Sequence, residues 1–176
     1  MNKLSLAEFS SLIETQSLKP RLKSELRFVA STESISDEEW ADRELLAISD
    51  RNGNKGVLLV SQDDLLYVLP YEFKSGITSS STGRSQSIIC NFCQTWQYGD
   101  KAGSISFTKS RTTNVSYLCC ADLKCSMHVR TKTLAAHTSR AQLREDLTNE
   151  QRIERLETRL KRILSELPVE PIRIQL

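Results

Sequence analysis

Five cysteines gathered between positions 90 and 125 constrain this 176-residue chain more than any other feature. Cys90 and Cys93 form a Cys-x2-Cys pair, and Cys119, Cys120 and Cys125 follow from 26 residues further on. Two sulfurs from a tight turn and two from a later turn can surround one Zn²⁺ tetrahedrally, because zinc accepts four thiolates without a directional preference. The spacing therefore predicts a structural zinc site.

The same cysteines have other interpretations. Free cysteine is among the most buried residue types, so these thiols could belong to an apolar core. Disulfides are disfavoured, because residues 1–10 show no hydrophobic signal segment that would indicate an oxidising compartment. A redox Cys-x-x-Cys opens a helix, whereas here Ile88-Ile89 leads into the pair and no helical pattern follows it. Structural zinc is the preferred interpretation.

The composition is that of an ordinary globular protein, with 39% hydrophobic and 26% charged residues. The longest apolar runs are far short of a membrane span, so we expect a cytoplasmic protein with no membrane partner. Charge is uneven: residues 1–50 hold six Lys/Arg and ten Asp/Glu, whereas residues 84–162 hold fourteen and seven. Four zinc-bound thiolates would reduce the resulting surplus of +7 to about +5. This asymmetry suits either a charged partner or an ordinary solvated surface.

The first fifty residues predict three short helices. Ser5 with a glutamate three residues later has the form of a capping box. Pro20 suits the first turn of a second helix, and Ser36 with its acidic neighbours suits the start of a third. The apolar stripes assigned to these helices are Phe9, Leu12 and Ile13; Leu22, Leu26 and Val29; and Trp40, Leu45 and Leu46.

After a turn cluster at residues 50–56 the pattern changes to that of β-structure. Residues 57–60 and 65–69 are short β-prone runs joined by a polar turn, which predicts a hairpin. Residues 74–87 are rich in Ser, Thr and Gly and predict a mobile loop. Further strands are predicted at residues 87–89, 105–108 and 115–118, delivering the first and second cysteine groups.

Two helices are predicted in the last third of the chain. Residues 122–130 can start a helix directly after the second cysteine group, and knuckle, hairpin and helix in this order describe a treble-clef zinc finger spanning residues 90–130. Residues 148–167 form the clearest periodic segment, with Thr148 and Gln151 as a capping box and prolines beyond the end. This amphipathic helix either docks on the sheet or contacts a partner or RNA. Its stripe is Ile153, Leu156, Leu160, Ile163, Leu164 and Leu167.

These elements predict an α+β fold. We expect an N-terminal helical region at residues 1–50 and an α/β domain at residues 51–176 that contains a small antiparallel sheet, the zinc finger and the C-terminal amphipathic helix. A closed four-sulfur site has no open position for substrate, and nucleophile motifs and Gly-rich phosphate loops are absent from the sequence. No enzyme activity and no small-molecule substrate are therefore expected.

The choice between Cys119 and Cys120 and the competing ligands His128 and His137 leave the zinc ligands open. Cys119 and Cys120 are neighbours, and neighbours on a strand point to opposite faces, so only one is expected to face the metal. His128 lies three residues after Cys125 and could coordinate in place of a cysteine. His137 lies in a polar stretch and is expected to be exposed.

Residues 117–130 resemble a known signature. From Cys120 onward the chain reads Cys-Ala-Asp-Leu-Lys-Cys-Ser-Met-His-Val-Arg, similar to the Cys-Ala-Asp-Leu-x-Cys-Ser-x-x-Val-Arg pattern of the bacterial FBP family. That family shares its C-terminal treble-clef zinc finger with the FusB-type elongation factor G-binding proteins. Cys90-Asn91-Phe92-Cys93 matches the family's first ligand pair. The resemblance implies one Zn²⁺ on Cys90, Cys93, Cys120 and Cys125.

The resemblance also implies a function. FusB-type proteins bind elongation factor G through the zinc-containing half and promote its release from the ribosome. The resemblance therefore implies that this chain is a non-enzymatic protein whose partner is elongation factor G. The basic groups expected to form the contact surface are Lys109, Arg111, Lys124, Arg130 and Lys132. The alternative is binding to the ribosome or ribosomal RNA, in which the same cations would contact phosphates. Trp96, Tyr98 and Phe107 would then stack on bases.

Overall fold

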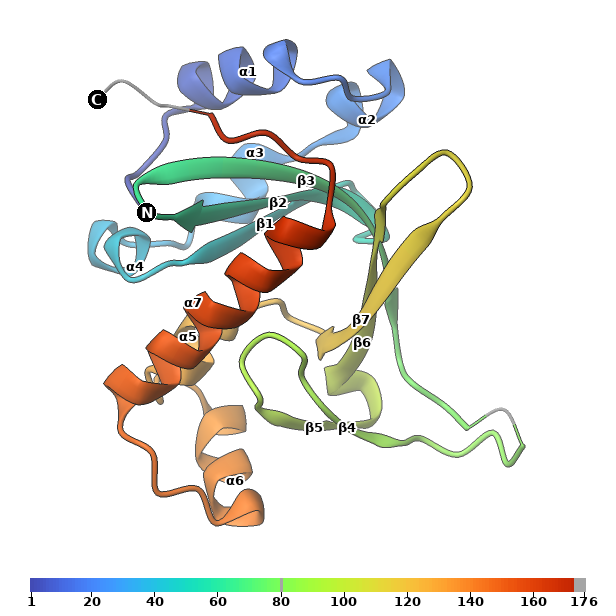
Figure 1. The fold of residues 1–176 in the computed structure, drawn as a ribbon, viewed down its shortest axis with the longest axis vertical. Coiled ribbons are helices and arrows are strands. Elements are labelled where there is room, and N and C mark those ends of the chain that lie inside the picture. Colours follow the sequence, from blue (N-terminus) through green and yellow to red (C-terminus); the bar gives the residue numbers. More distant parts are fainter. Residues whose placement is uncertain (80, 173–176) are drawn as a thin grey trace. The chain divides into compact units, whose positions relative to one another are not determined.

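The computed structural model describes residues 1–79 and 81–172 and divides the chain into two compact units. Unit 1 contains Met1–Glu72 together with the described residues from Val169 onward, and unit 2 contains Phe73–Pro168. Helices and antiparallel strands occur in both units, so the predicted α+β class is confirmed (Figure 1). The expected division at residue 50 stays a prediction, and positions 80 and 173–176 of the predicted loop and domain lie outside the described residues.

The strands of unit 1 are β1 (Leu45–Ser49), β2 (Lys55–Gln62) and β3 (Leu65–Ser75), whose last three residues belong to unit 2. β1 pairs with β2 and β2 with β3, all antiparallel, and the predicted hairpin is therefore confirmed. Asp63 and Asp64 at its turn both have positive φ, 51° and 60°, as a two-residue hairpin turn requires.

The helices of unit 1 are α1 (Leu6–Thr15), α2 (Pro20–Glu25), α3 (Phe28–Thr32) and α4 (Asp37–Ala41). The predicted capping box at the start of α1 is present, since Ser5 Oγ accepts from Glu8 N and Glu8 Oε2 accepts from Ser5 N. Alternate residues of the three strands and the apolar faces of the helices form one core. The core consists of Leu4, Phe9, Leu12, Ile13, Phe28, Trp40, Leu46, Ile48, Val57, Leu59, Leu66 and Val68.

Two predictions for the first fifty residues are wrong. Leu45 and Leu46 begin strand β1 rather than continue a helix, because pairing with Val60 and Leu59 buries both side chains in the sheet. A short apolar run does not distinguish a helix from a buried strand. The second predicted helix is broken at Leu26, which has extended backbone, so that Phe28 can stack on the ring of Phe9 at a centroid distance of 4.5 Å.

Unit 2 contains β4 (Ser87–Ile89), β5 (Trp96–Tyr98), β6 (Ala102–Thr108) and β7 (Asn114–Cys120), with a 3-10 turn η1 (Gly99–Lys101) before β6. β4 pairs with β5 and β6 with β7, which confirms the strands predicted in this region. The segment predicted as a loop before β4 contains an isolated bridge between Thr78 and Ser85.

The helices of unit 2 are α5 (Cys125–Val129), α6 (Leu134–Leu143) and α7 (Asn149–Glu166). α5 starts three residues later than predicted, because Leu123 has a φ of 50° and the chain turns there. α6 was not predicted, since its sequence is mostly polar and only Ala136 and Ser139 are buried. α7 begins and ends one residue inside the predicted range 148–167 and has the predicted Thr148 capping box. Among the helices of residues 1–79 and 81–172, none is both long and apolar enough to cross a membrane.

Candidate metal centre

The first two sulfurs of the centre come from a tight turn between β4 and β5. The backbone N–H of Cys90 donates to Thr95 O at 3.0 Å, and the N–H of Gln94 donates to Cys90 O at 3.0 Å. Gln94 adopts left-handed backbone with a φ of 61°, and its side-chain amide donates to the same Cys90 carbonyl at 3.0 Å. These bonds close the turn and place the sulfurs of Cys90 and Cys93 in the same group.

The other two sulfurs come from the junction of β7 and α5. Cys120 is the last residue of β7, opposite Ala102, and Cys125 is the first residue of α5. Between them Leu123 N–H donates to Cys120 O at 3.1 Å, and Asp122 Oδ1 accepts from Lys124 N at 3.1 Å. The turn therefore places the end of a strand and the start of a helix on the same side as the first pair.

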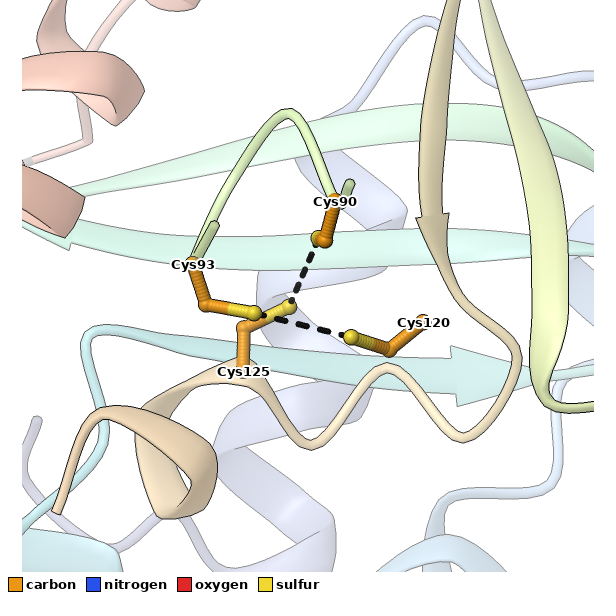
Figure 2. A group of neighbouring side chains, drawn as sticks. All are labelled: Cys90, Cys93, Cys120 and Cys125. Carbon is orange, nitrogen blue, oxygen red and sulfur yellow. Dashed lines mark hydrogen bonds between the residues drawn. The ribbon is translucent and has the colours of Figure 1, made fainter. Parts of the chain in front are cut away.

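All four Sγ atoms lie within 4.8 Å of one another. The sulfurs of Cys90 and Cys125 are 3.7 Å apart and those of Cys93 and Cys120 are 3.5 Å apart (Figure 2). A disulfide needs about 2.05 Å, whereas a tetrahedral zinc with bonds of about 2.3 Å places its sulfurs about 3.8 Å apart. The four cysteines therefore fit one structural Zn²⁺ and no disulfide.

The structure brings together the four cysteines implied by the family signature and leaves Cys119 outside the group. Cys119 lies opposite Gly103 in the β6–β7 hairpin, and alternation along the strand turns its side chain away from that of Cys120. Burial raises the pKa of the Cys119 thiol, which keeps it protonated and unreactive. Cys119 is thus a buried apolar residue beside the centre.

The thiols of the centre influence one another's ionisation. Burial raises the pKa of Cys90, but hydrogen bonds from the other three thiols outweigh it and lower that pKa well below its ordinary value. Hydrogen bonds with Cys120, Cys90 and Cys93, together with burial, raise the pKa of Cys125. Zinc binds thiolates, so a Zn²⁺ would displace the protons that these thiols carry.

Two further buried side chains contact the sulfurs. Gln97 Nε2 donates to Cys120 Sγ at 3.2 Å, and the Cys93 thiol donates to Thr95 Oγ1 at 3.1 Å. Once Cys93 is a thiolate, the Thr95 hydroxyl can donate to it instead. Sequence reasoning missed both residues, although the alternation in Trp96-Gln97-Tyr98 is a signal that a polar side chain faces inward between two outward aromatic ones.

His128 supports the centre from beside it. It is fully buried, with Nε2 3.1 Å from Asp122 Oδ1 and Nδ1 2.6 Å from Thr133 Oγ1. A carboxylate only accepts, so Nε2 donates to Asp122, and Nδ1 shares a hydrogen bond with the Thr133 hydroxyl. That hydroxyl oxygen in turn accepts from Ala136 N at the start of α6 at 3.2 Å. His128 therefore links the turn between the last two cysteines to α6, while His137 is exposed on α6 as expected.

The predicted basic residues form two groups rather than one patch. Lys109 and Arg111 are exposed at the tip of the β6–β7 hairpin, about 20 Å along the strands from Cys120 at roughly 3.4 Å per residue (Figure 1). The other three residues flank α5, next to the centre. Lys124 and Lys132 are exposed, and half-buried Arg130 donates from Nη1 to Ser126 O at 3.1 Å.

Comparison with known proteins agrees with this geometry. No curated protein and no solved structure matched the chain. A family model described as the FBP C-terminal treble-clef zinc-finger matches residues 15–167, which is most of the chain. The knuckle, hairpin and helix that carry the four cysteines are the parts of such a finger. The chain therefore belongs to the FBP C-terminal treble-clef zinc-finger family.

Proposed function

We propose that this chain is a non-enzymatic cytoplasmic protein that binds elongation factor G and promotes its release from the ribosome, as FusB-type proteins do. The observation that carries the proposal is the four-cysteine centre in a chain that belongs to the FBP C-terminal treble-clef family. Four sulfurs complete the coordination of zinc, so the ion would hold the finger together without an open position for chemistry.

The proposed contact surface begins at α5. Cys125 starts this helix, so an ion on its sulfur fixes the positions of exposed Lys124 and Lys132 at either end of it. A rigid arrangement of cations loses little conformational freedom on binding and steers association with an acidic protein surface. Lys109 and Arg111 at the hairpin tip would form a second, separate contact.

Calorimetric titration of purified elongation factor G into the zinc-loaded protein tests the proposal. Lys124→Glu should weaken binding about tenfold or more, since a reversed charge at an interface costs more than one kcal/mol. Lys19→Glu is a matched control, because Lys19 also precedes a short helix without a side-chain cap but lies in unit 1. No measurable binding by the unmodified protein, or equal loss in both variants, would contradict the proposal.

One observation favours the alternative, binding to ribosomal RNA. Trp96 and Tyr98 lie on the same face of β5 with ring planes 7° apart and centroids 6.3 Å apart, and Tyr98 is 52% exposed. Two parallel rings suit base stacking. Phe107, expected to join them, is 2% exposed and is buried against Tyr117, so it cannot stack on RNA.

Sedimentation with ribosomes at moderate and high salt separates the two functions. RNA binding predicts pelleting without elongation factor G, strong loss of pelleting at high salt and loss in Tyr98→Ala. Binding to the factor predicts that the protein remains in the supernatant with ribosomes alone. Lys124→Glu would weaken either function, because the same cations would contact phosphates, whereas Tyr98→Ala should affect RNA binding alone.

A further inference from the structure

The charge of the loaded centre needs compensation within unit 2. Four thiolates and one Zn²⁺ carry a net charge of −2, and the four cysteines are at most 1% exposed. A buried charge is costly unless opposite charges or hydrogen-bond donors lie nearby. Gln97 supplies one neutral donor to Cys120. One amide donor is small against two units of buried charge, so cations are expected around the sulfurs.

The arginines in the first three turns of helix α7 are less exposed than the glutamates in those turns. Arg152 is buried and Arg155 and Arg159 are half-buried, whereas Glu150, Glu154 and Glu157 of the same helix are exposed. Arg152 and Arg159 are seven residues apart, which is close to two helical turns, so they lie on one face. The buried residues Leu156 and Leu160 lie on the adjoining part of the same buried face. Thus α7 presents cations, as well as apolar groups, to the interior of unit 2.

Arg159 reaches the first cysteine turn. Its Nη1 donates to the carbonyl of Asn91, which lies between Cys90 and Cys93, at 3.4 Å. Asn91 also connects the cysteine turn to β7, because its Oδ1 accepts a hydrogen bond from Leu118 N at 2.6 Å. The guanidinium therefore lies against the backbone that positions two of the four sulfurs.

Arg152 is held where α7 meets α5, which lie side by side (Figure 1). It is 1% exposed, and its Nη1 donates at 3.1 Å to the hydroxyl of Thr131, directly after α5. Glu145 lies 3.2 Å from Arg152 Nε and 2.6 Å from Arg155 Nη2. One carboxylate cannot neutralise two guanidiniums, so a surplus of positive charge remains in the interior beside the centre.

Both guanidiniums lose part of their hydration in the interior of unit 2. Burial lowers the pKa of Arg152 and Arg159, and the neighbouring arginines lower it further. Glu145 and, to a smaller extent, negative charge on Cys93 oppose this lowering of the Arg152 pKa, and charge on Cys90 and Cys93 opposes it for Arg159. Positive charge at these positions is what a buried, negatively charged centre requires.

We propose that Arg152 and Arg159 are outer components of the metal centre, where their positive charge helps to balance the −2 charge of a zinc tetrathiolate and couples docking of α7 to metal loading. This inference concerns how the ion is held and is independent of which partner the protein binds. Both residues act through charge and position, and neither contacts the ion directly. Removal of either charge should therefore weaken zinc binding without changing the stoichiometry.

Competition for zinc with a coloured chelator, with the purified full chain and no partner, tests this proposal. Arg159→Met keeps much of the side-chain volume and removes the charge, and it should weaken zinc affinity by about tenfold or more, the usual effect of losing an outer-sphere partner. Arg159→Lys keeps the charge and should retain most of the affinity. Arg162→Met is the matched control, because this arginine is one turn further along α7 and its side chain is 67% exposed.

Three results would overturn the proposal. Arg159→Met could bind zinc as tightly as the unmodified protein, or Arg162→Met could lose as much affinity as Arg159→Met. Arg159→Lys could lose as much as Arg159→Met, which would assign the effect to the guanidinium fork rather than to charge. Arg152→Met is the second variant. Its zinc affinity should fall by the same factor, and it should still bind one zinc per chain at saturation.

Discussion

The two units of this chain differ in what they bury besides apolar side chains. In unit 1 the core is a continuous set of aliphatic and aromatic residues between strands β1–β3 and the helices, and among its described residues Arg43 and Glu44 are the buried charged ones. Unit 2 also buries apolar residues, Ile105, Phe107, Leu156 and Leu160 among them, but it adds four buried cysteines and the polar residues Thr95, Gln97, Ser126, His128, Ser139 and Arg152. Unit 1 is organised by apolar burial, whereas unit 2 combines an apolar core with a metal centre.

This difference implies different conditions for stability. Apolar burial requires no cofactor and contributes about 25 cal/mol for each Å² removed from water. A four-cysteine centre contributes only when the ion is bound, because a structural zinc site rarely exists in the unfolded chain. We therefore expect the stability of unit 2 to depend on zinc and that of unit 1 to be nearly independent of it.

Cys93→Ser tests this contrast with the largest expected effect. Loss of one thiolate should abolish stoichiometric zinc binding and remove stabilisation on the order of 10 kcal/mol, so unit 2 unfolds. Hydrogen exchange should show lost protection in Phe73–Pro168 and retained protection in β1, β2 and α1. A protein that has no bound zinc but keeps the melting behaviour of the unmodified chain would contradict the zinc-dependent stability of unit 2.

Trp40→Ala is the corresponding change in unit 1. Trp40 is 2% exposed and packs against Phe28 at a ring-centroid distance of 6.5 Å. Its truncation should cost about 3–5 kcal/mol by leaving a cavity in the apolar core. Urea denaturation followed by hydrogen exchange should show the loss in unit 1, while elemental analysis still finds one zinc per chain.

Trp96→Ala is the matched control for this substitution. Trp96 is the other tryptophan, half-buried on β5 in unit 2. Its truncation should cost much less, because part of the side chain is already in water. If Trp40→Ala also releases zinc, the two units are not energetically separate, and the contrast between them is wrong.

The sequence predicted the metal centre better than its surroundings, for a physical reason. Four thiolates must meet at one ion, so short cysteine spacings reveal which turns come together. The capping boxes at Ser5 and Thr148 are equally local and were predicted correctly. Gln97 and Arg152 acquire their roles only through contacts distant along the chain, and their side chains have ordinary surface alternatives. Helical periodicity assigns charged residues to the solvated face, whereas Arg152 is 1% exposed.

The errors in unit 1 have a similar origin. Leu45 and Leu46 suit a helix and a strand equally well, and the choice is made by partner strand β2, which offers Val60 and Leu59 opposite them. The segment after Pro20 has helical spacing throughout, yet Phe28 leaves that register to stack on Phe9. Packing of large side chains thus overrides local propensity.

His128→Ala sharpens the distinction between a ligand and its support. The substitution leaves Asp122 and Thr133 without their shared partner and should cost about 1–3 kcal/mol. Zinc content should stay at one ion per chain, because the four sulfurs are retained. Cys125→Ser, with loss of zinc, provides the comparison. Loss of stoichiometric zinc in His128→Ala would make this histidine a ligand.

Ser5→Ala and Thr148→Ala give the smallest effects and compare the units most directly. Each removes the hydroxyl of a capping box, one at the start of α1 in unit 1 and the other at the start of α7 in unit 2. Each should cost about 1 kcal/mol, the usual effect of losing such a cap. Fraying of α7 loosens its first turns, which carry Arg152, so only Thr148→Ala should speed zinc release to a chelator. Equal release rates in both variants would show that the start of α7 does not contribute to holding the ion.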